Sequence, residues 1–294
     1  MKTIKSLGIV LGLLLIASLV SCQKEKAGVY SPKKKIQRIY YAWNGHEKEP
    51  FQHWEWNGDK LNSITHYMDY DLKDDPWVES FTYEDNRVTR VDNYTYSEYI
   101  TYDYDGDHLK TATIFYENAI VCSWAVSYDG NHINKMAGTF YDMKKGAKLH
   151  LNPLSHLLPP DICRSIVKCE QKLAQQRHED ETFALTLLLT WTNDNISKIV
   201  CTGDGEYIDF QLQYDDKNCP FYGFMGDLQD YLVNFTAGHT GFTKHNLTSM
   251  IVTEGHYSDT VCFAYQYDKD KYPVFQTMYY SDDVDDKHVL YFEY

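Results

Sequence analysis

The sequence lacks the motifs of the common catalytic and metal-binding sites. It contains no HExxH pair of zinc ligands, no GxSxG nucleophile elbow and no phosphate-binding loop, and its 12 histidines are scattered along the chain. No Cys-x-x-Cys pair and no Cys/His spacing typical of zinc is present. The sequence therefore assigns no catalytic residue, no metal ligand and no cofactor-binding residue.

Positive charge is also scarce. Lys and Arg number 28 against 42 Asp and Glu, which gives a formal net charge of −14 at pH 7. Charge repulsion therefore makes nucleic acid and anionic lipid headgroups poor partners for the chain as a whole. Proline and glycine are few, at 8 and 16 residues, whereas tyrosine is abundant, at 26. The length of 294 residues is ample for a sizeable hydrophobic core.

The N-terminus carries an apolar run, Leu7 to Val20, that is too short to form a stable membrane span. The sequence LVSC at residues 19–22 looks like a bacterial lipobox, in which the cysteine receives the lipid. We therefore predict a lipoprotein signal peptide over residues 1–21, lipidation at Cys22, and a flexible tether over residues 22–35. The alternative is an ordinary secretory signal peptide in which Cys22 has no role.

The residues after the cysteine bear on the compartment. Gln23 is not the aspartate of an inner-membrane retention signal, which favours the outer membrane, facing the periplasm or the cell surface. Gln23-Lys24-Glu25 also resembles, loosely, the export tags of surface lipoproteins in Bacteroidetes. An envelope compartment permits disulfides, but the even number of remaining cysteines assigns no pairing. These cysteines are Cys122, Cys163, Cys169, Cys201, Cys219 and Cys262.

From residue 36 onward a single pattern recurs. An aromatic anchor precedes a turn, and the residues five and eight positions after each anchor are apolar or aromatic in all sixteen cases. Polar residues alternate with them, so each repeat predicts an antiparallel β-hairpin with an aromatic, inward face and a mainly wet outer face. The anchors are Trp56, Tyr83, Tyr104, Tyr128, Trp191, Tyr214, Phe242 and Tyr267.

Turn chemistry predicts how the strands of each hairpin pair. Asn-Gly or Asp-Gly after Trp56, Tyr104 and Tyr128 predicts type I′ turns, which place the residue two before the anchor opposite the residue five after it. Residues 84–87 lack glycine and predict a four-residue loop. The residue eight after the anchor falls on the outer face unless a bulge intervenes, and the sequence does not decide this.

The pattern begins and ends on half-hairpins. Residues 35–39 match only the second half of a repeat, and residues 289–294 match only the first half. Pairing the two would remove both edges of the sheet. We predict an all-β fold in one domain, 36–294: an antiparallel meander of about eight hairpins, curled or closed into a large soluble barrel-like sheet. A β-propeller and an open single-layer sheet are the alternatives.

Two inserts interrupt the repeats. Residues 142–182 contain two turn signals and then a stretch from Asp161 to about His178 that predicts a helix. Residues 223–241 are irregular and compatible with a short helix. Either insert can fill the interior of a large barrel or decorate its surface, and the sequence leaves both options open.

The Tyr-Asp-Gly hairpins, as at Tyr104 and Tyr128, look like the repeats of the YD/RHS class. Together with the lipobox they resemble a family of uncharacterised Bacteroidetes lipoproteins that is described as having a porin-like fold. The chain differs from RHS shells in being short and in showing no processed toxin domain at its C-terminus. The resemblance implies a porin-like β fold and transfers no activity and no catalytic residue.

Acidic segments offer the only candidate chemistry. Asp103–Asp107 has the spacing of three calcium ligands but lacks the downstream glutamate of an EF-hand, so a hairpin turn is favoured. Residues 281–286 are favoured as a solvated acidic loop over a divalent-ion site.

Two functional hypotheses follow. The first is a non-enzymatic binding or scaffold protein of the cell envelope, held on the membrane by lipid on Cys22, with a glycan or another envelope protein as partner. Sugars stack well on exposed indole rings, and four tryptophans are candidates, although core packing explains most of them better: Trp43, Trp54, Trp77 and Trp124. The alternative is a hydrolase of extracellular polysaccharide, which requires two carboxylates facing each other in one cleft.

Overall fold

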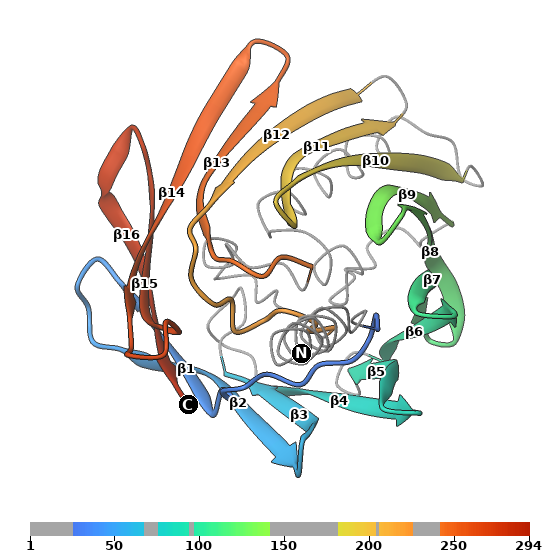
Figure 1. Ribbon diagram of the computed structural model, residues 1–294, viewed down its shortest axis with the longest axis horizontal. Helices are drawn as coiled ribbons and strands as arrows, with labels where there is room; N and C mark the ends of the chain where they lie inside the picture. Colours follow the sequence, from blue (N-terminus) through green and yellow to red (C-terminus); the bar gives the residue numbers. More distant parts are fainter. Residues whose placement is uncertain (1–25, 68–75, 94–96, 142–181, 204–205, 226–241) are drawn as a thin grey trace, which may run out of the picture.

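The computed structural model describes residues 26–67, 76–93, 97–141, 182–203, 206–225 and 242–294. These residues form sixteen antiparallel strands that close into one barrel (Figure 1). The strands are β1 (Arg38–Trp43), β2 (Glu49–Asn57), β3 (Lys60–His66), β4 (Trp77–Glu84), β5 (Arg87–Asn93), β6 (Glu98–Asp105), β7 (His108–Tyr116), β8 (Ala119–Asp129), β9 (His132–Phe140), β10 (Phe183–Thr192), β11 (Asn195–Gly203), β12 (Glu206–Tyr214), β13 (Leu247–Glu254), β14 (Tyr257–Tyr267), β15 (Pro273–Tyr280) and β16 (Asp283–Glu293). Within the described part of the chain, no helix is long and apolar enough to span a bilayer.

The two half-hairpins of the sequence close the barrel. β1 pairs with β16 in continuous antiparallel register, from Arg38 opposite Glu293 to Trp43 opposite His288. Every other strand pairs with its neighbours in the sequence. The predicted all-β meander and its closure are confirmed, and the propeller and the open sheet are ruled out. Closure leaves no strand with a row of unpaired backbone groups at a sheet edge.

The barrel has two unlike ends. We call the end formed by the connections β2–β3, β4–β5, β6–β7, β8–β9, β10–β11, β12–β13 and β14–β15 the turn end, and the opposite end the far end. The turn end carries the anchor aromatics. The far end carries the connections β1–β2, β7–β8, β13–β14 and β15–β16.

A β-bulge lies next to the anchor in each regular hairpin of the turn end. In β6–β7, Tyr104 pairs with Leu109 and Tyr102 pairs with Ala112, with the register shift between Asp103 and Tyr104. The same shift precedes the anchors of β2–β3, β4–β5, β8–β9, β10–β11 and β14–β15. The pairing predicted for the glycine turns is therefore wrong. The turn occupies the second and third residues after the anchor, so the anchor faces the residue five after it, and the bulge then adds a residue to the second strand, so the residue two before the anchor faces the residue eight after it. That extra residue returns the position eight after the anchor to the inner face.

The tight turns also differ from the prediction. At Gly58, Gly106 and Gly130 only the glycine has a positive φ, between 57° and 60°, as in a type II′ turn. Residues 84–87 are not a four-residue loop, since Asp85 and Asn86 both have positive φ, at 47° and 66°, and form a two-residue type I′ turn. Asx side chains tolerate this conformation better than most residues, which explains how the turn forms without glycine.

The polar tip of each anchor explains why tyrosine and tryptophan recur. In five consecutive hairpins, the hydroxyl or indole N–H of the anchor forms a hydrogen bond with the backbone of the residue five positions after the preceding anchor. For Trp56, which follows a half-hairpin, the corresponding residue is Ile36. Each such bond contributes about 1 kcal/mol, and burial raises the pKa of Tyr83 and Tyr128 to about 12. The bonds are Trp56 Nε1 to Ile36 O (2.8 Å), Tyr83 OH to Leu61 O (2.8 Å), Tyr104 OH to Val88 O (2.6 Å), Leu109 N–H to Tyr128 OH (3.0 Å) and Trp191 Nε1 to Ile133 O (2.6 Å).

Two of the eight predicted hairpins are in fact one. Tyr214 at the end of β12 pairs with Leu247 at the start of β13, and residues 215–246 connect them. The expected second strand after Tyr214 contains Pro220, which has no N–H to donate to a ladder. This reduces the predicted number of hairpins, and the described strands number sixteen.

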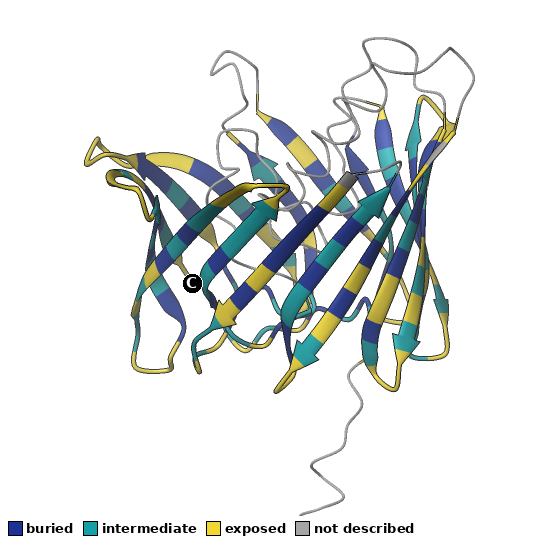
Figure 2. Cartoon of the chain, turned by 90° about the horizontal axis from the view of Figure 1, so that it is seen from above, coloured by how far each residue is buried: buried dark blue, intermediate teal, exposed yellow. Residues whose placement is uncertain are grey.

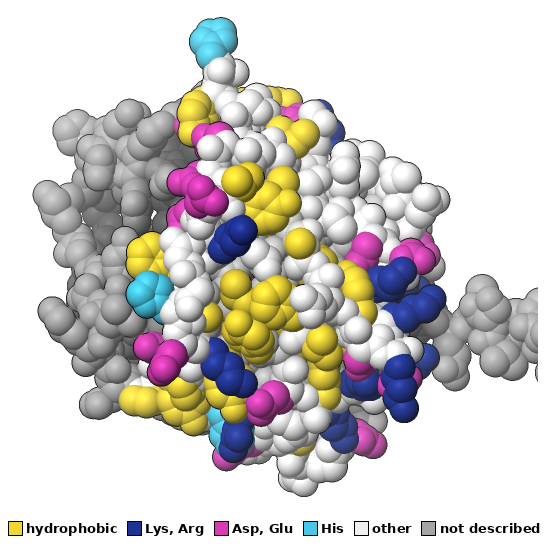
Figure 3. All heavy atoms as spheres, turned by 90° about the vertical axis from the view of Figure 1, so that its left-hand side faces the viewer, with side chains coloured by type: hydrophobic (Ala, Val, Ile, Leu, Met, Phe, Trp, Pro, Cys, Tyr) yellow, Lys and Arg dark blue, Asp and Glu magenta, His cyan; other side chains and the backbone are white. Residues whose placement is uncertain are grey.

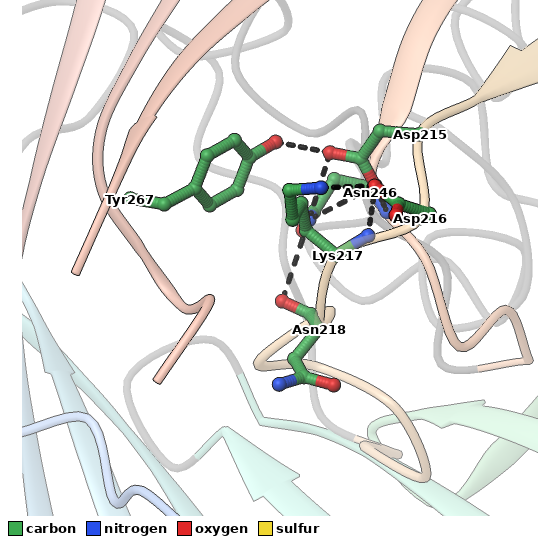
Figure 4. A network of polar contacts seen from close by, with 6 residues as sticks. All are labelled: Asp215, Asp216, Lys217, Asn218, Asn246 and Tyr267. Atoms are coloured by element: carbon green, nitrogen blue, oxygen red, sulfur yellow. Dashed lines mark hydrogen bonds and ion pairs between the residues drawn. The ribbon is translucent and has the colours of Figure 1, made fainter. Parts of the chain in front are cut away.

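A polar network fastens both ends of this connection (Figure 4). The Asp215 carboxylate accepts hydrogen bonds from the backbone N–H groups of Lys217 (2.9 Å) and Asn246 (3.1 Å), and also from the hydroxyl of Tyr267. The Asn246 amide donates to the carbonyl of Asn218 (3.3 Å). Burial, followed by the bond to Asp215, raises the pKa of Tyr267. The network holds the base of β12, β13 and β14 together.

Residues 219–225 of the connection cross the barrel interior. The ring of Phe224 lies 5.0 Å from that of Trp54 on β2 and 6.0 Å from that of Phe81 on β4, and the Tyr102 hydroxyl on β6 donates to the Met225 carbonyl (3.0 Å). In the ring of sixteen strands β4 lies directly across from β12, so the segment reaches the opposite wall. The insert 223–241 therefore begins inside the barrel, although only residues 223–225 of it are described. Residues 142–181 of the expected helical insert lie outside the described residues.

The segment before β1 is not a free tether. Residues 26–35, which we call the strap, run across the barrel at the turn end (Figure 1). Tyr30 is buried, and its hydroxyl donates to the Pro220 carbonyl (2.7 Å). Lys34 pairs with Asp268 and Asp270 of the β14–β15 turn. Residues 26–35 of the predicted tether thus contact the barrel at several points, while residues 1–25, including Cys22, lie outside the described residues.

The wall alternates in polarity along each strand, as the buried and exposed bands in Figure 2 show. Inward side chains are aromatic and aliphatic and form one cluster with Tyr30, Phe221 and Phe224. Outward positions along the strands include polar residues such as Thr82 on β4 and Gln213 on β12. The four described cysteines, Cys122, Cys201, Cys219 and Cys262, are thiols.

Candidate functional site

The acidic segments singled out in the sequence serve the fold. The Asp103 carboxylate accepts a hydrogen bond from Thr111 (2.7 Å), and Asp107 pairs with Arg87 (3.3 Å) across neighbouring turns. Asp283 accepts the backbone N–H of Asp286 (3.2 Å) at the start of β16. Across the described ranges, no group of three or more His, Cys, Asp or Glu side chains is placed to hold a metal ion. Residues 106–107 and 281–282 of these segments form the turns of the hairpins β6–β7 and β15–β16, and the neighbouring aspartates belong to the strands.

Three of the four candidate tryptophans are core residues. Trp54, Trp77 and Trp124 are between 0 % and 4 % exposed, so they present no ring to a ligand. Trp43 is 47 % exposed, stacks on His46 with ring centroids 5.8 Å apart, and donates from its indole N–H to Asp286 (2.6 Å). The structure thus leaves one of the four rings available at the far end.

A polar pocket lies at the far end, beside the neighbouring hairpins β5–β6 and β7–β8. Its volume is about 370 Å³, which is in the range of a site for a small ligand. We call it the rim pocket. Its lining residues are Arg90, Asp92, Asn93, Ser97, Glu98, Tyr99, Glu117 and Asn118.

One wall of the rim pocket is a fixed ion pair on the outer face of β5. The Arg90 guanidinium donates from Nε to both oxygens of Asp92, at 2.9 and 2.8 Å, and from a terminal nitrogen at 2.5 Å. It also stacks on the ring of Tyr99, 3.6 Å from the centroid. The bonds to Asp92 raise the pKa of Arg90. This pairing holds a flat charged group and an aromatic ring in place before any ligand arrives.

A second aromatic ring continues this wall. Tyr99 stacks on Phe115 of β7, with ring centroids 4.5 Å apart and planes inclined by 11°. Phe115 in turn pairs in register with Ile120 of β8, which is 47 % exposed. The outer face beside the pocket is therefore a short aromatic and apolar strip bounded by an ion pair.

Asn93 is the residue of this site whose chemistry the fold does not use. Its side chain is fully buried, and among the described residues neither its amide nitrogen nor its amide oxygen has a hydrogen-bond partner. An unmatched buried amide costs about 1–3 kcal/mol. Asn93 pairs in register with Glu79 on one side and Glu98 on the other, so it stands between two carboxylates on the inner face.

A directed hydrogen-bond chain orients Glu79. The Trp54 indole can only donate, so its 3.0 Å bond fixes the oxygen of Gln52 as acceptor. The Gln52 nitrogen then donates to Nδ1 of His66 (3.3 Å), which leaves the proton of a neutral imidazole on Nε2 to be donated to Glu79 (3.3 Å). Burial lowers the pKa of His66 to about 3, which keeps the ring neutral. His66 also stacks on Trp77, with centroids 3.7 Å apart.

This arrangement suits binding better than hydrolysis. Glu79 and Glu98 are 0 % and 2 % exposed, respectively, so neither carboxylate opens directly to a polymer. The groups that do face the pocket are planar and hydrogen-bonding, namely a guanidinium, carboxylates, amides and a phenol ring. Such groups match ligands rich in hydroxyls.

Sequence reasoning did not find the rim pocket. Its residues are spread over two strands and two connections, and no short motif joins them. One signal was present: β5 reads Arg-x-Asp at outward positions and then places Asn93 at a position where the repeat carries apolar residues. A polar residue at an inward position of a strand marks a departure from the core pattern.

Comparison with known proteins supports the fold. Twenty-three chains of solved structures match this one. A porin-like protein from Bacteroides uniformis ATCC 8492 matches with a TM-score of 0.50 and 10 % identity, over 92 % of this chain and 99 % of that chain. A porin-like protein from Bacteroides vulgatus ATCC 8482 matches with a TM-score of 0.37 and 13 % identity, over 88 % and 98 %. No family model and no curated protein matches the chain. The first likeness shows a porin-like barrel fold.

Proposed function

We propose that this chain is a non-enzymatic binding protein of the outer membrane, anchored by lipid on Cys22, that holds a unit of a glycan in the rim pocket. The observation that carries the proposal is the preorganised wall that Arg90, Asp92 and Tyr99 form on the outer face of the pocket. A sugar hydroxyl both donates and accepts, so it can bond the guanidinium and the carboxylate of that wall. The proposal extends the glycan expectation from tryptophan rings to this pocket.

The filled interior supports binding at the rim over conduction through the barrel. The strap and residues 219–225 lie within the ring of strands, and aromatic side chains from several strands pack on them. The apolar inner face and polar outer positions are the reverse of a barrel that meets lipid with its outer wall. We expect a chain that begins at Gln23 to remain in solution without detergent. Partition of that chain into detergent would contradict this part of the proposal.

A binding experiment tests the proposal directly. The chain beginning at Gln23 is screened on a glycan array, and positive glycans are titrated by calorimetry against Arg90→Ala and Tyr99→Leu. We expect each substitution to weaken binding by tenfold or more, because each removes a preformed contact.

A second cation, carboxylate and tyrosine group supplies the matched control. Lys198 pairs with Asp209 (2.5 Å), and Tyr207 bonds the same carboxylate (3.3 Å), on the outer faces of β11 and β12. Lys198→Ala and Tyr207→Leu should leave binding within twofold of the parent. Equal losses in the pocket and control variants, or an array with no positive glycan, would reject the rim pocket and leave a scaffold role.

The hydrolase alternative has one observation in its favour. Glu79 and Glu98 flank Asn93 in register, so their Cα atoms lie two strand spacings apart, roughly 10 Å. Two carboxylates at such a separation can serve glycoside hydrolysis when a substrate reaches them. Turnover of an array-positive glycan that is abolished by Glu98→Gln would establish this alternative, and binding without turnover would support the proposal above.

A further inference from the structure

The strap fixes where the chain leaves the barrel toward Cys22. The backbone N–H of Ala27 donates to the carbonyl of Asp107 (2.9 Å) in the β6–β7 turn, and the carbonyl of Gly28 accepts from the N–H of Val88 (2.9 Å). Both contacts lie at the turn end. Lys26, the first described residue, directly precedes these contacts and so lies at this end.

Contacts with several separate turns hold the strap in one position. Gly28 has φ +79°, and a Cβ placed on it would lie 2.1 Å from the Tyr104 hydroxyl oxygen, so only glycine fits this crossing. At the other side of the barrel mouth, Lys35 donates to the carbonyl of Gly58 and pairs with Asp59, both at 2.8 Å. Together with the ion pairs of Lys34, these contacts tie the strap to three separate turns of the same end.

The chain between the anchor and the strap is short. Cys22 is four residues before Lys26, and four residues extend at most about 14 Å. The longest strands have 11 residues, so at about 3.4 Å per residue and a tilt near 40° the wall is roughly 28 Å tall. A lipid on Cys22 therefore reaches the bilayer only if the turn end is the nearer end.

The distribution of charge favours the same orientation. Figure 3 shows Lys and Arg side chains gathered toward one end of the face that β14, β15, β16 and β1 present, the turn end. Lys33, Lys60, Lys269 and Lys271 belong to this end, whereas the β15–β16 hairpin at the far end carries Asp282, Asp283, Asp285 and Asp286. The chain as a whole is acidic, so an anionic bilayer repels the far end more strongly than the turn end.

We propose that the turn end of the barrel lies against the surface of the lipid bilayer and that the far end, with the rim pocket, points away from it into the aqueous space. This inference rests on the proposed anchoring at Cys22. It gives the tight turns and the strap a membrane-facing role and places the pocket where a ligand can reach it. The partner of the turn end is the headgroup layer of the membrane that holds the lipid.

The two ends of β8 allow a matched measurement. Ala119→Cys places a thiol at the far end of this strand, and Asn131→Cys places one in the turn that follows it. Both positions are exposed. Each single variant of the lipidated full chain is labelled with bimane and reconstituted on vesicles that contain a lipid with a quenching nitroxide near its headgroup. We expect the Asn131 label to be quenched at least threefold more than the Ala119 label.

Controls separate the failure of orientation from the failure of anchoring. Mass spectrometry of the N-terminal peptide and sedimentation with vesicles report lipidation independently, and Cys22→Ala should stay in the supernatant. An unlipidated wild-type chain would reject the anchoring and with it the orientation. A lipidated chain with equal quenching at both labels, with stronger quenching at Ala119, or with none at either label would reject the orientation alone.

Lengthening the connection provides a second measurement that leaves the barrel unchanged. Twelve Gly/Ser residues inserted between Glu25 and Lys26 extend the reach of the anchor without altering the strap. We expect the difference in quenching between the two labels to fall by at least half, because the longer linker lets the barrel tumble. An unchanged difference would show that the lipid does not set the orientation through the short connection.

Discussion

The two ends of this barrel are built in different ways. At the turn end one solution recurs: a bulge, a tight turn, and an aromatic tip bonded to the backbone of the preceding hairpin. At the far end each hairpin differs, and the inner face carries His66, Glu79, Asn93 and Glu98 in place of the apolar residues found elsewhere. The repeated end supplies closure and stability, whereas the variable end places buried polar groups that cost stability. Sites that depart from the local folding pattern are where function is expected.

The strongest test of this difference is the strap crossing at the turn end. Gly28→Val introduces a side chain against Tyr104 in a backbone conformation with φ +79°, so we expect a loss of about 3 kcal/mol or more in the free energy of unfolding. Urea denaturation of the chain beginning at Gln23 measures it.

Gly130→Ala is the control for Gly28→Val. Gly130 also has a positive φ, +60°, but nothing lies within 4 Å of the added Cβ. Its cost should be only the backbone strain of about 1 kcal/mol. Equal losses at the two glycines would mean that the strap contact adds no stability to the turn end.

Low pH should destabilise the far end of the barrel first. Burial lowers the pKa of His66 to about 3, against 6.5 for the free side chain. Between these two pH values the unfolded chain therefore binds a proton that the folded chain does not bind. The contribution of His66 to the free energy of unfolding is therefore fully present above pH 6.5 and is lost as the pH drops toward 3. At about 1.4 kcal/mol per pKa unit the loss amounts to a few kcal/mol.

His66→Gln removes the titrating group. It should lower the free energy of unfolding at neutral pH, because the hydrogen-bond chain from Trp54 to Glu79 is broken. It should also make the decline of that free energy between pH 6.5 and 3 less steep. The measurement is urea denaturation at several pH values. A decline as steep as in the parent chain would assign the acid sensitivity to other groups.

Removing one aromatic tip at the turn end should have a smaller effect. Tyr83→Phe keeps the packed ring and deletes the hydroxyl that donates to the Leu61 carbonyl, so we expect a loss of about 1 kcal/mol. Tyr40→Phe is the control, because its hydroxyl makes an exposed 3.2 Å bond to Glu293. A loss at Tyr83 no larger than at Tyr40 would show that the repeated tip bonds do not stabilise the closed end.

The repeated end was largely predictable from the sequence, for a physical reason. A hairpin is local, and its anchor, turn and inward residues lie within about a dozen positions, so the pattern is visible without a structure. The pairing of β1 with β16 is distant in sequence but followed from the two unmatched half-repeats. The bulge was invisible because one added residue leaves the apolar spacing unchanged.

The candidate site was not predictable to the same degree. The rim pocket draws Arg90, Tyr99 and Asn118 from separate strands and turns, and their proximity depends on sheet register. The route of residues 219–225 through the interior was missed because their apolar spacing also fits a strand. The strap was missed because three lysines and two turn-forming residues are equally typical of a tether, and only the aspartates of distant turns make them contacts.

The smallest expected change has the opposite sign to the others and bears most directly on the contrast between the ends. Asn93→Leu replaces a buried amide that has no partner among the described residues by an apolar side chain of similar volume. Because an unmatched buried polar group is a cost, we expect the free energy of unfolding to stay level or rise by up to about 1 kcal/mol. The same variant should leave glycan binding within twofold of the parent, because the Asn93 side chain is fully buried on the inner face, whereas Arg90 and Tyr99 form the outer wall of the pocket. Asn62→Leu, an exposed amide on β3, should change neither property. A loss of stability would show that the buried amide supports the fold, whereas level or higher stability with binding unchanged would show that the far end carries a buried polar group at a cost and that recognition depends on the outer wall.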